Sequence, residues 1–178
     1  MTDALTAELS RLDELLTQYP FAQSRLRPPA PEGAVDEVAG RIGIAAPNTV
    51  RKLYAWRDGA SQAGGWPLFL FPTFYQFLTL KEVEEQAAWP ISWSADVGVA
   101  GFPFAMDMSG RFLVAQSGED DVVLRVSSDH VGPAEPESSL LGLILLSCQA
   151  LTGEHEEFVL SFADDRMSWT TPDEKGLL

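Results

Sequence analysis

The chain has 178 residues, 46% hydrophobic and 21% charged, a composition typical of one globular domain with a sizeable core. Its net charge is −14, and residues 118–178 carry 13 acids against 3 bases, which disfavours nucleic acid and anionic membranes as partners. One cysteine, Cys148, excludes an internal disulfide. The sequence contains neither a signal-peptide pattern nor an apolar run long enough to cross a bilayer, so we expect a cytoplasmic protein.

Two amphipathic helices are predicted before residue 45. The first covers residues 3–18, with Thr2 expected as its N-cap. Four leucines recur on one side of it, at Leu5, Leu9, Leu12 and Leu16. Residues 26–31, with the sequence LRPPAP, predict a stiff extended connection inside the domain. The second helix then begins at Pro31 and ends at Gly43.

The stretch from Pro47 to Gly59, PNTVRKLYAWRDG, predicts a third, short helix. Proline is tolerated in a first helical turn, where its missing N–H would be unpaired anyway. The apolar stripe of this helix consists of Val50, Leu53 and Tyr54. We expect Gly59 to end the helix in a left-handed conformation, and we expect the stripe to pack on a sheet.

The next forty residues are rich in aromatic side chains. Residues 66–70 and 74–78 predict short strands, and residues 79–86 predict a helix capped by Thr79. Residues 87–94 predict a structured loop that holds Trp89, Pro90 and Trp93. We expect about a third of the aromatic side chains in this region to be partly exposed, because core packing remains the default.

The clearest sheet pattern comes after residue 100. Alternating apolar residues and turn signals predict an antiparallel meander with strands at residues 102–106, 111–116 and 122–126. A loop over residues 128–138 leads to a last helix, capped by Ser138 or Ser139 and ending at Gly153. Residues 158–162 predict an edge strand, and residues 164–178 an acidic tail with frayed ends. The fold class expected is therefore α+β, a mostly antiparallel sheet packed by N-terminal helices and a C-terminal helix.

Three segments in this order resemble the SUKH superfamily of the Smi/Knr type. They are LRPPAPEGAVDEVAGRIGIAAPNTVRKLYAWRDG, FPFAMDMSGRFLV and LGLILLSCQAL. The positions that match the family pattern are Pro47, Leu53, Tyr54, Asp58, Gly59, Pro103, Phe104, Ala105, Asp107 and Gly110. The resemblance covers residues 26–151 of a single domain, and the chain departs from it in having Asp-Gly where Asn-Gly is usual.

The resemblance implies an α+β fold and a role in protein binding. Most bacterial members look like immunity proteins, which bind a cognate toxin or effector and silence it stoichiometrically. We therefore expect an immunity protein that acts by occlusion. The alternative is a regulatory interaction module of the same fold, and the least favoured reading is a small hydrolase. The family pattern supplies no catalytic residues.

Catalytic chemistry is not indicated by the residues themselves. Neither His130 nor His155 lies in a recognisable motif, and the run from Glu154 to Glu157 is a poor chelate because adjacent side chains point in different directions. Cys148 lies on an apolar helix face, which favours a packing role. We expect no enzymatic turnover, no cofactor and no metal.

Two groups of residues are the candidates for binding a partner. The acidic group comprises the turn Glu119, Asp120 and Asp121 together with Asp129 and Glu135. The aromatic group comprises Trp66, Tyr75, Trp89 and Trp93. Acids would steer a basic toxin towards the protein and aromatics would anchor it. The alternative for the acids is a solvated hairpin tip, and for the aromatics it is the core.

Overall fold

The computed structural model describes residues 3–61, 67–72, 74–119, 121–133, 139–163 and 166–170. Within these ranges the helices are α1 (Ala4–Leu16), α2 (Pro20–Arg25), α3 (Ala34–Ile42), α4 (Asn48–Trp56), α5 (Leu80–Gln86), α6 (Ala88–Ala95) and α7 (Leu140–Thr152). The strands are β1 (Gln76–Phe77), β2 (Gly101–Met106), β3 (Phe112–Gln116), β4 (Val123–Val126), β5 (Val131–Pro133), β6 (Val159–Ala163) and β7 (Arg166–Thr170). No helix in the described ranges has the length and apolarity needed to cross a membrane.

Strands β1 to β5 form one antiparallel sheet, and their order in space is their order in the chain. This meander, together with the helices, confirms the predicted α+β fold. Strands β6 and β7 form a separate two-stranded hairpin. The edge strand predicted near residues 158–162 is thereby confirmed, whereas residues 166–170 form a strand where we expected an acidic tail.

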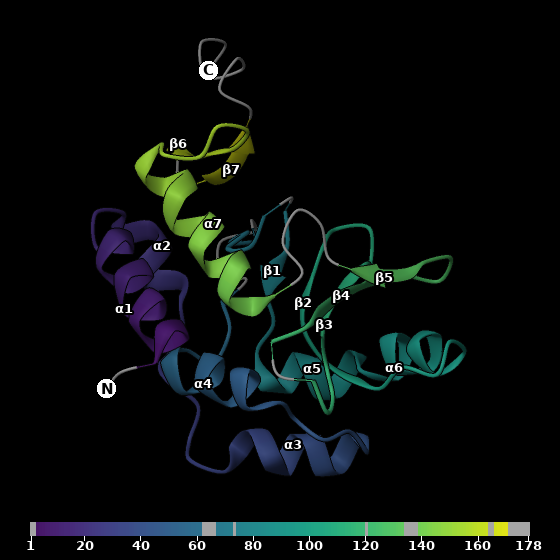
Figure 1. Cartoon of the computed structure of the whole chain (residues 1–178). Helices are drawn as coiled ribbons and strands as arrows, with labels where there is room; N and C mark the ends of the chain where they lie inside the picture. Colours follow the sequence, from purple (N-terminus) through teal and green to yellow (C-terminus); the bar gives the residue numbers. More distant parts are fainter. Residues whose placement is uncertain are drawn as a thin grey trace.

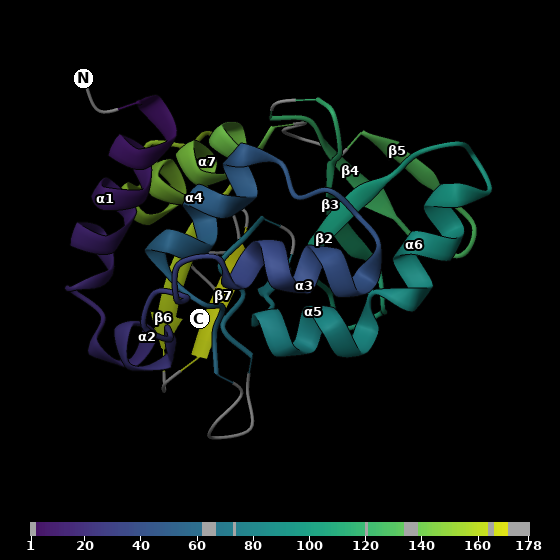
Figure 2. The same cartoon turned by 90° about the horizontal axis from the view of Figure 1, so that it is seen from below.

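The helices lie on different sides of the sheet (Figure 1). Helix α1, near the N-terminus, runs beside α7, and the β6–β7 hairpin lies beyond the far end of α7. Helices α5 and α6 follow one another along the other side, where α6 contacts β2 and β4. Helix α3 packs against α5, as the view from below shows (Figure 2).

Helix α1 confirms the first predicted apolar stripe, because Leu5, Leu9, Leu12 and Leu16 are all buried. Its start differs by one residue from the prediction. Asp3 is the N-cap, and its Oδ1 accepts a hydrogen bond from the Thr6 backbone N–H at 3.4 Å. Aspartate caps a helix as well as threonine does, so the pattern alone does not separate the two positions.

Helix α4 is the centre of the aromatic core. Leu53 and Tyr54 are fully buried, as predicted. The Tyr54 ring lies 5.1 Å from the ring of Phe77 in β1 and 6.1 Å from the ring of Phe102 in β2, measured between centroids. Its hydroxyl donates to the carbonyl oxygen of Leu78 at 2.9 Å. The α4 stripe therefore packs on the β1–β2 side of the sheet, which confirms that part of the architecture.

Gly59 does not end α4, contrary to our prediction. The helix stops at Trp56, and the next residue, Arg57, is extended with a φ of −151°. Gly59 does adopt a left-handed conformation, with a φ of +73°, but its role is to bring the backbone against a later segment. A Cβ at this position would overlap the backbone of Leu78 and Thr79. The glycine therefore serves a close approach of two chain segments.

Several other elements depart from their predictions, because proline and aromatic residues occur in more than one kind of element. Helix α1 ends at Leu16, two residues earlier than expected, and Pro20 begins the separate helix α2, since proline fits a first helical turn. Of the two strands expected over residues 66–78, the described part contains only β1, with an isolated bridge between Phe71 and Tyr75. The loop expected over residues 128–138 contains β5. At α7 the prediction holds: Ser139 caps the helix by accepting from the Gly142 N–H at 2.9 Å, and Gly153 ends it.

Candidate partner-binding surfaces

The predicted acidic residues do not gather into one patch. Glu119 is exposed in the turn between β3 and β4, whereas Asp129 is exposed in the turn at the opposite end of β4. Asp120 and Glu135 lie outside the described residues. Because β4 separates the two turns, Glu119 and Asp129 would meet different parts of a partner.

Asp121 has a structural role rather than the solvent-facing one that we predicted. It adopts a left-handed conformation with a φ of +68°, and it is only half-exposed. Its Oδ1 accepts a hydrogen bond from the backbone N–H of Leu141 at 3.1 Å. An acceptor at the first turn of a helix satisfies an unpaired N–H and complements the helix dipole. Asp121 and Ser139 therefore both cap α7, one from a distant turn and one locally.

Tyr75 is buried, with 3% of its surface exposed, so it cannot contact a partner as we expected. Trp66 lies outside the described residues. The other described aromatics of this region fall into two groups. Phe69, Phe71 and Phe77 are buried in the core, whereas Phe74, Trp89 and Trp93 are partly exposed. Three of the seven described members are thus partly exposed, somewhat more than the third that we expected.

Trp89 and Trp93 lie on α6, a helix in the place where we predicted a loop. The difference arises at Pro90, because proline disfavours a helix interior but not a helix start. It lies in the first turn of α6, directly after α5 ends at Gln86, and a first turn does not use its N–H groups. Ser94, one turn further on, donates its hydroxyl proton to the Pro90 carbonyl at 2.7 Å. Both tryptophans are thus held on a regular helix.

The two tryptophans form a ridge, the α6 tryptophan pair, with one member anchored and one presented. The Trp93 ring lies 6.2 Å from the ring of Phe112 in β3 and 6.2 Å from that of Trp89. Trp89 is 64% exposed. Holding so large an apolar side chain in water has an energetic cost, and such residues are enriched at the centres of protein interfaces. The pair is the best-formed candidate contact among the predicted site residues.

The chain around the α6 tryptophan pair is acidic. From residue 82 to residue 110 there is no lysine or arginine, whereas five acids occur, at Glu82, Glu84, Glu85, Asp96 and Asp107. Asp96 directly follows α6 and is exposed, and so is the neighbouring Val97. Glu84 and Glu85 are paired with basic residues and Asp107 is bound to Arg111. Asp96 is therefore the exposed acid next to the ridge that suits a basic surface on a partner.

Sequence reasoning missed a second group at the end of the sheet where the β2–β3 turn lies. Asp107 is buried, and its Oδ1 accepts from the N–H and hydroxyl of Ser109 and from the N–H of Arg111, each at 2.9 Å. Its Oδ2 accepts from Arg111 Nε at 2.6 Å. Arg125 of β4 belongs to the same end of the sheet. One signal was available: Arg125 is the single base between residues 112 and 165.

Cys148 and His155, which were considered for catalysis, lie in surroundings that do not activate them. Burial raises the pKa of Cys148 to about 11, which keeps it a thiol at neutral pH. The Nδ1 atom of His155 accepts hydrogen bonds from the N–H groups of Glu157 and Phe158, both at 3.1 Å, so it is committed to a local turn. Within the described residues no group of three or more His, Cys, Asp or Glu side chains is placed to hold a metal ion. The absence of enzymatic activity remains a prediction.

In comparisons with known proteins, no family model matches this chain and no curated protein matches it. Membership of the SUKH superfamily therefore remains a prediction, carried by the motifs and by an α+β fold compatible with it.

Proposed function

We propose that this protein is an immunity protein of the cytoplasm, which binds a cognate toxin or effector stoichiometrically and silences it by occlusion. The SUKH resemblance supplies the class of function. The observation that carries the proposal is the α6 tryptophan pair, in which Trp93 packs on the sheet and Trp89 is left 64% exposed. A solvent-exposed tryptophan on a fixed helix is suited to fill a pocket of another protein.

The charge pattern supports a division of roles in this binding. Asp96 places an exposed negative charge directly after the ridge, which would raise the association rate of a basic partner at low salt. Trp89 would determine mainly how long the complex lasts, because a buried aromatic anchor affects dissociation more than association. Glu119 is in the β3–β4 turn rather than on α6 and would contribute through the overall field.

The test is surface-binding kinetics with the cognate toxin or effector. Trp89→Ala should weaken binding by about 2 kcal/mol or more, seen as roughly thirtyfold faster dissociation. Met108→Ala is the matched control, since Met108 is a large apolar side chain, 75% exposed, in the β2–β3 turn. Its rates should stay at the wild-type values. Equal dissociation rates for Trp89→Ala and the wild type would refute α6 as the anchor.

A second pair of variants separates steering from solubility. Asp96→Lys should slow association severalfold at low salt, and the difference should shrink as salt is added. Glu119→Lys changes the net charge by the same amount in a different turn and should slow association less. If both substitutions slow association equally, the overall charge of the protein matters and the flank of α6 does not. If no effector binds at all, the immunity proposal itself fails.

A further inference from the structure

A row of polar side chains crosses the sheet just beyond the last registered pairs. Those last pairs run Gln76 to Met106, Met106 to Phe112, Phe112 to Val126 and Val126 to Val131. Two backbone hydrogen bonds extend the strand pairing by one residue. The Asp107 N–H donates to the Arg111 carbonyl at 2.9 Å, and the Ser127 N–H donates to the His130 carbonyl at 2.8 Å. The next row therefore consists of Tyr75, Asp107, Arg111, Ser127 and His130.

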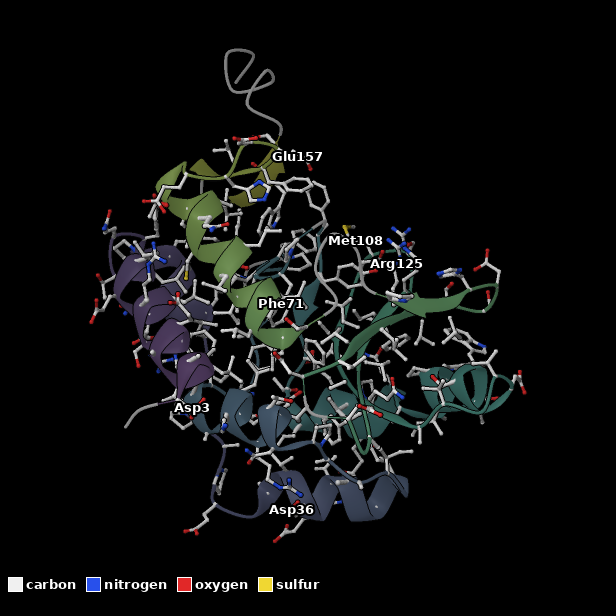
Figure 3. The ribbon with its side chains drawn as sticks, viewed as in Figure 1. Asp3, Asp36, Phe71, Met108, Arg125 and Glu157 are labelled. Carbon is white, nitrogen blue, oxygen red and sulfur yellow. The ribbon has the colours of Figure 1, made fainter. Side chains whose placement is uncertain are left out.

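This row faces the side of the sheet away from α6. Side chains of successive rows point to opposite faces, and Phe112 of the preceding row packs on Trp93 of α6. Arg125 pairs with Leu113 and with Gly132, one row further inward, so it shares the face of Arg111. Figure 3 shows Arg125 extending from β4 towards the side where Met108 projects. Two arginines and a histidine thus occupy one end of one face.

The position of the His130 imidazole depends on residue 132 being a glycine. A Cβ at Gly132 would lie 2.7 Å from Nε2 of His130, so the imidazole occupies the space that a side chain there would fill. Gly132 is the cross-strand partner of Arg125. The imidazole is therefore held beside the Arg125 position, and it is exposed.

Arg111 is held in a fixed orientation. Its Nε donates to Asp107, whose other oxygen accepts three hydrogen bonds from the turn. This buried carboxylate holds one edge of the guanidinium and also raises the pKa of Arg111. The remaining N–H groups of Arg111 make no further bond to the described residues, and half of the side chain is exposed. An arginine anchored in this way is pre-organised to bind an anion with its free edge.

The guanidinium of Arg125 has no counter-charge within the described residues. Among the described residues it makes neither an ion pair nor a hydrogen bond, although it is half-buried and the chain contains 26 acids. Arg41, Arg51 and Arg57, by contrast, each bind a carboxylate of another segment. A partly desolvated cation without a partner is costly, and an anionic ligand would relieve that cost.

The hydroxyl of Tyr75 is a second polar group without a partner among the described residues at this place. The side chain is 97% buried, and its oxygen makes no hydrogen bond. Burial, together with the smaller effect of the Asp107 charge, raises the pKa of Tyr75 to about 12, although Arg111 and Arg125 act in the opposite direction. The phenol therefore remains protonated at neutral pH, near enough to both arginines for their charges to act on it, with its hydroxyl enclosed by the protein.

We propose that this end of the sheet, formed by Arg111, Arg125 and His130, is a binding site for an oxyanion, a carboxylate or phosphate group. The forks of the two arginines match the paired oxygens of such a group. The neighbouring Asp129 opposes it with negative charge, although its carboxylate is turned to the Ser127 hydroxyl at 2.7 Å. The site lies on the sheet face opposite the α6 tryptophan pair, so it stands independently of the proposed toxin contact.

The test is titration of the isotopically labelled protein with inorganic phosphate and, separately, with acetate at constant ionic strength. The resonances followed are the Nε–H groups of Arg111 and Arg125 and the backbone amide of Gly132. We expect a saturable shift in the wild type and at least about tenfold weaker binding in Arg125→Gln, since a charge-assisted hydrogen bond is lost. Arg51→Gln, which changes an exposed arginine of α4, should bind as the wild type does. Asp129→Asn should bind more tightly.

The outcomes are distinct. Saturation by both anions supports the site and indicates carboxylate recognition, whereas saturation by phosphate alone supports it as a phosphate site. Shifts that grow without saturation, or equal affinities for the wild type and Arg125→Gln, would overturn the proposal. Should Arg125→Gln fail to fold, Arg125→Lys retains the charge without the fork, and wild-type affinity in that variant would overturn the proposal equally.

Discussion

Two buried tyrosines give a matched test of how the core is organised. Tyr54 is fully buried and Tyr75 is 97% buried. They differ in their hydroxyl groups: that of Tyr54 donates to the Leu78 carbonyl at 2.9 Å, whereas that of Tyr75 has no partner among the described residues. The same substitution, tyrosine to phenylalanine, should therefore have different consequences at the two positions.

At Tyr54 the substitution leaves the buried carbonyl of Leu78 without this donor. Removing one member of a buried hydrogen bond costs about 1–3 kcal/mol, because the remaining group has lost its water as well as its partner. The ring contacts with Phe77 and Phe102 are retained, so no cavity term is added. At Tyr75 the substitution removes a hydroxyl that lost its water on folding without gaining a hydrogen bond to the described residues. Tyr75→Phe should therefore leave the free energy of unfolding unchanged or raise it.

Urea denaturation followed by tryptophan fluorescence gives both free energies of unfolding. The m-values of the variants should equal that of the wild type, which confirms that stability alone has changed. The reasoning is refuted if Tyr54→Phe costs less than about half a kcal/mol, or if Tyr75→Phe costs as much as Tyr54→Phe.

Three further substitutions test other parts of the fold. Leu53→Ala should cost about 2–5 kcal/mol in urea denaturation, as a large-to-small change at a fully buried position; a loss under half a kcal/mol would contradict the packing of α4 on the sheet. Gly59→Ala should lower the free energy of unfolding more than Gly43→Ala does, because both glycines have a φ near +74° but, of the two, a Cβ has open space only at Gly43. Equal losses of about 1–2 kcal/mol would mean that backbone strain alone explains both, and that the close approach at Gly59 adds nothing. The wild type should lose up to about 2 kcal/mol of stability relative to Cys148→Ala as the pH rises from 9 to 11, because the unfolded thiol ionises first, near 9.0, and the folded one near 11. Parallel pH profiles of the two proteins would contradict that burial.

The sequence is sufficient where local rules and tertiary packing agree. The leucines of α1, the capping box of Thr79 and Glu82 at the start of α5, and the meander from β2 to β4 all follow from spacing and turn residues. Each of these signals depends on contacts a few residues apart or on simple alternation. Together they are strong enough to predict the fold class from the residue pattern alone.

The failures share a different physical cause. Pro90 lies in a first helical turn because α5 ends at Gln86 and a new helix begins at Ala88. The helix propensity of a single residue does not reveal where the preceding helix ends. Asp121 has the composition of a solvated turn, but its bond to Leu141 joins residues twenty positions apart. Tyr75 and Trp89 are both aromatic residues in an aromatic-rich stretch, and the packing of the sheet decides which of them is buried. Site residues are therefore harder to predict than elements.

The pairing of α1 with α7 has a consequence for the order in which the chain matures during synthesis. The two helices lie side by side, yet more than a hundred residues separate them in the chain. At about 5–20 residues per second, α1 leaves the ribosome on the order of ten seconds before α7 can cover its leucine stripe. An isolated helix of 13 residues is marginal in water, so α1 remains frayed and apolar throughout that interval. The nascent chain should therefore bind holdase chaperones through α1 and release them only when α7 has emerged.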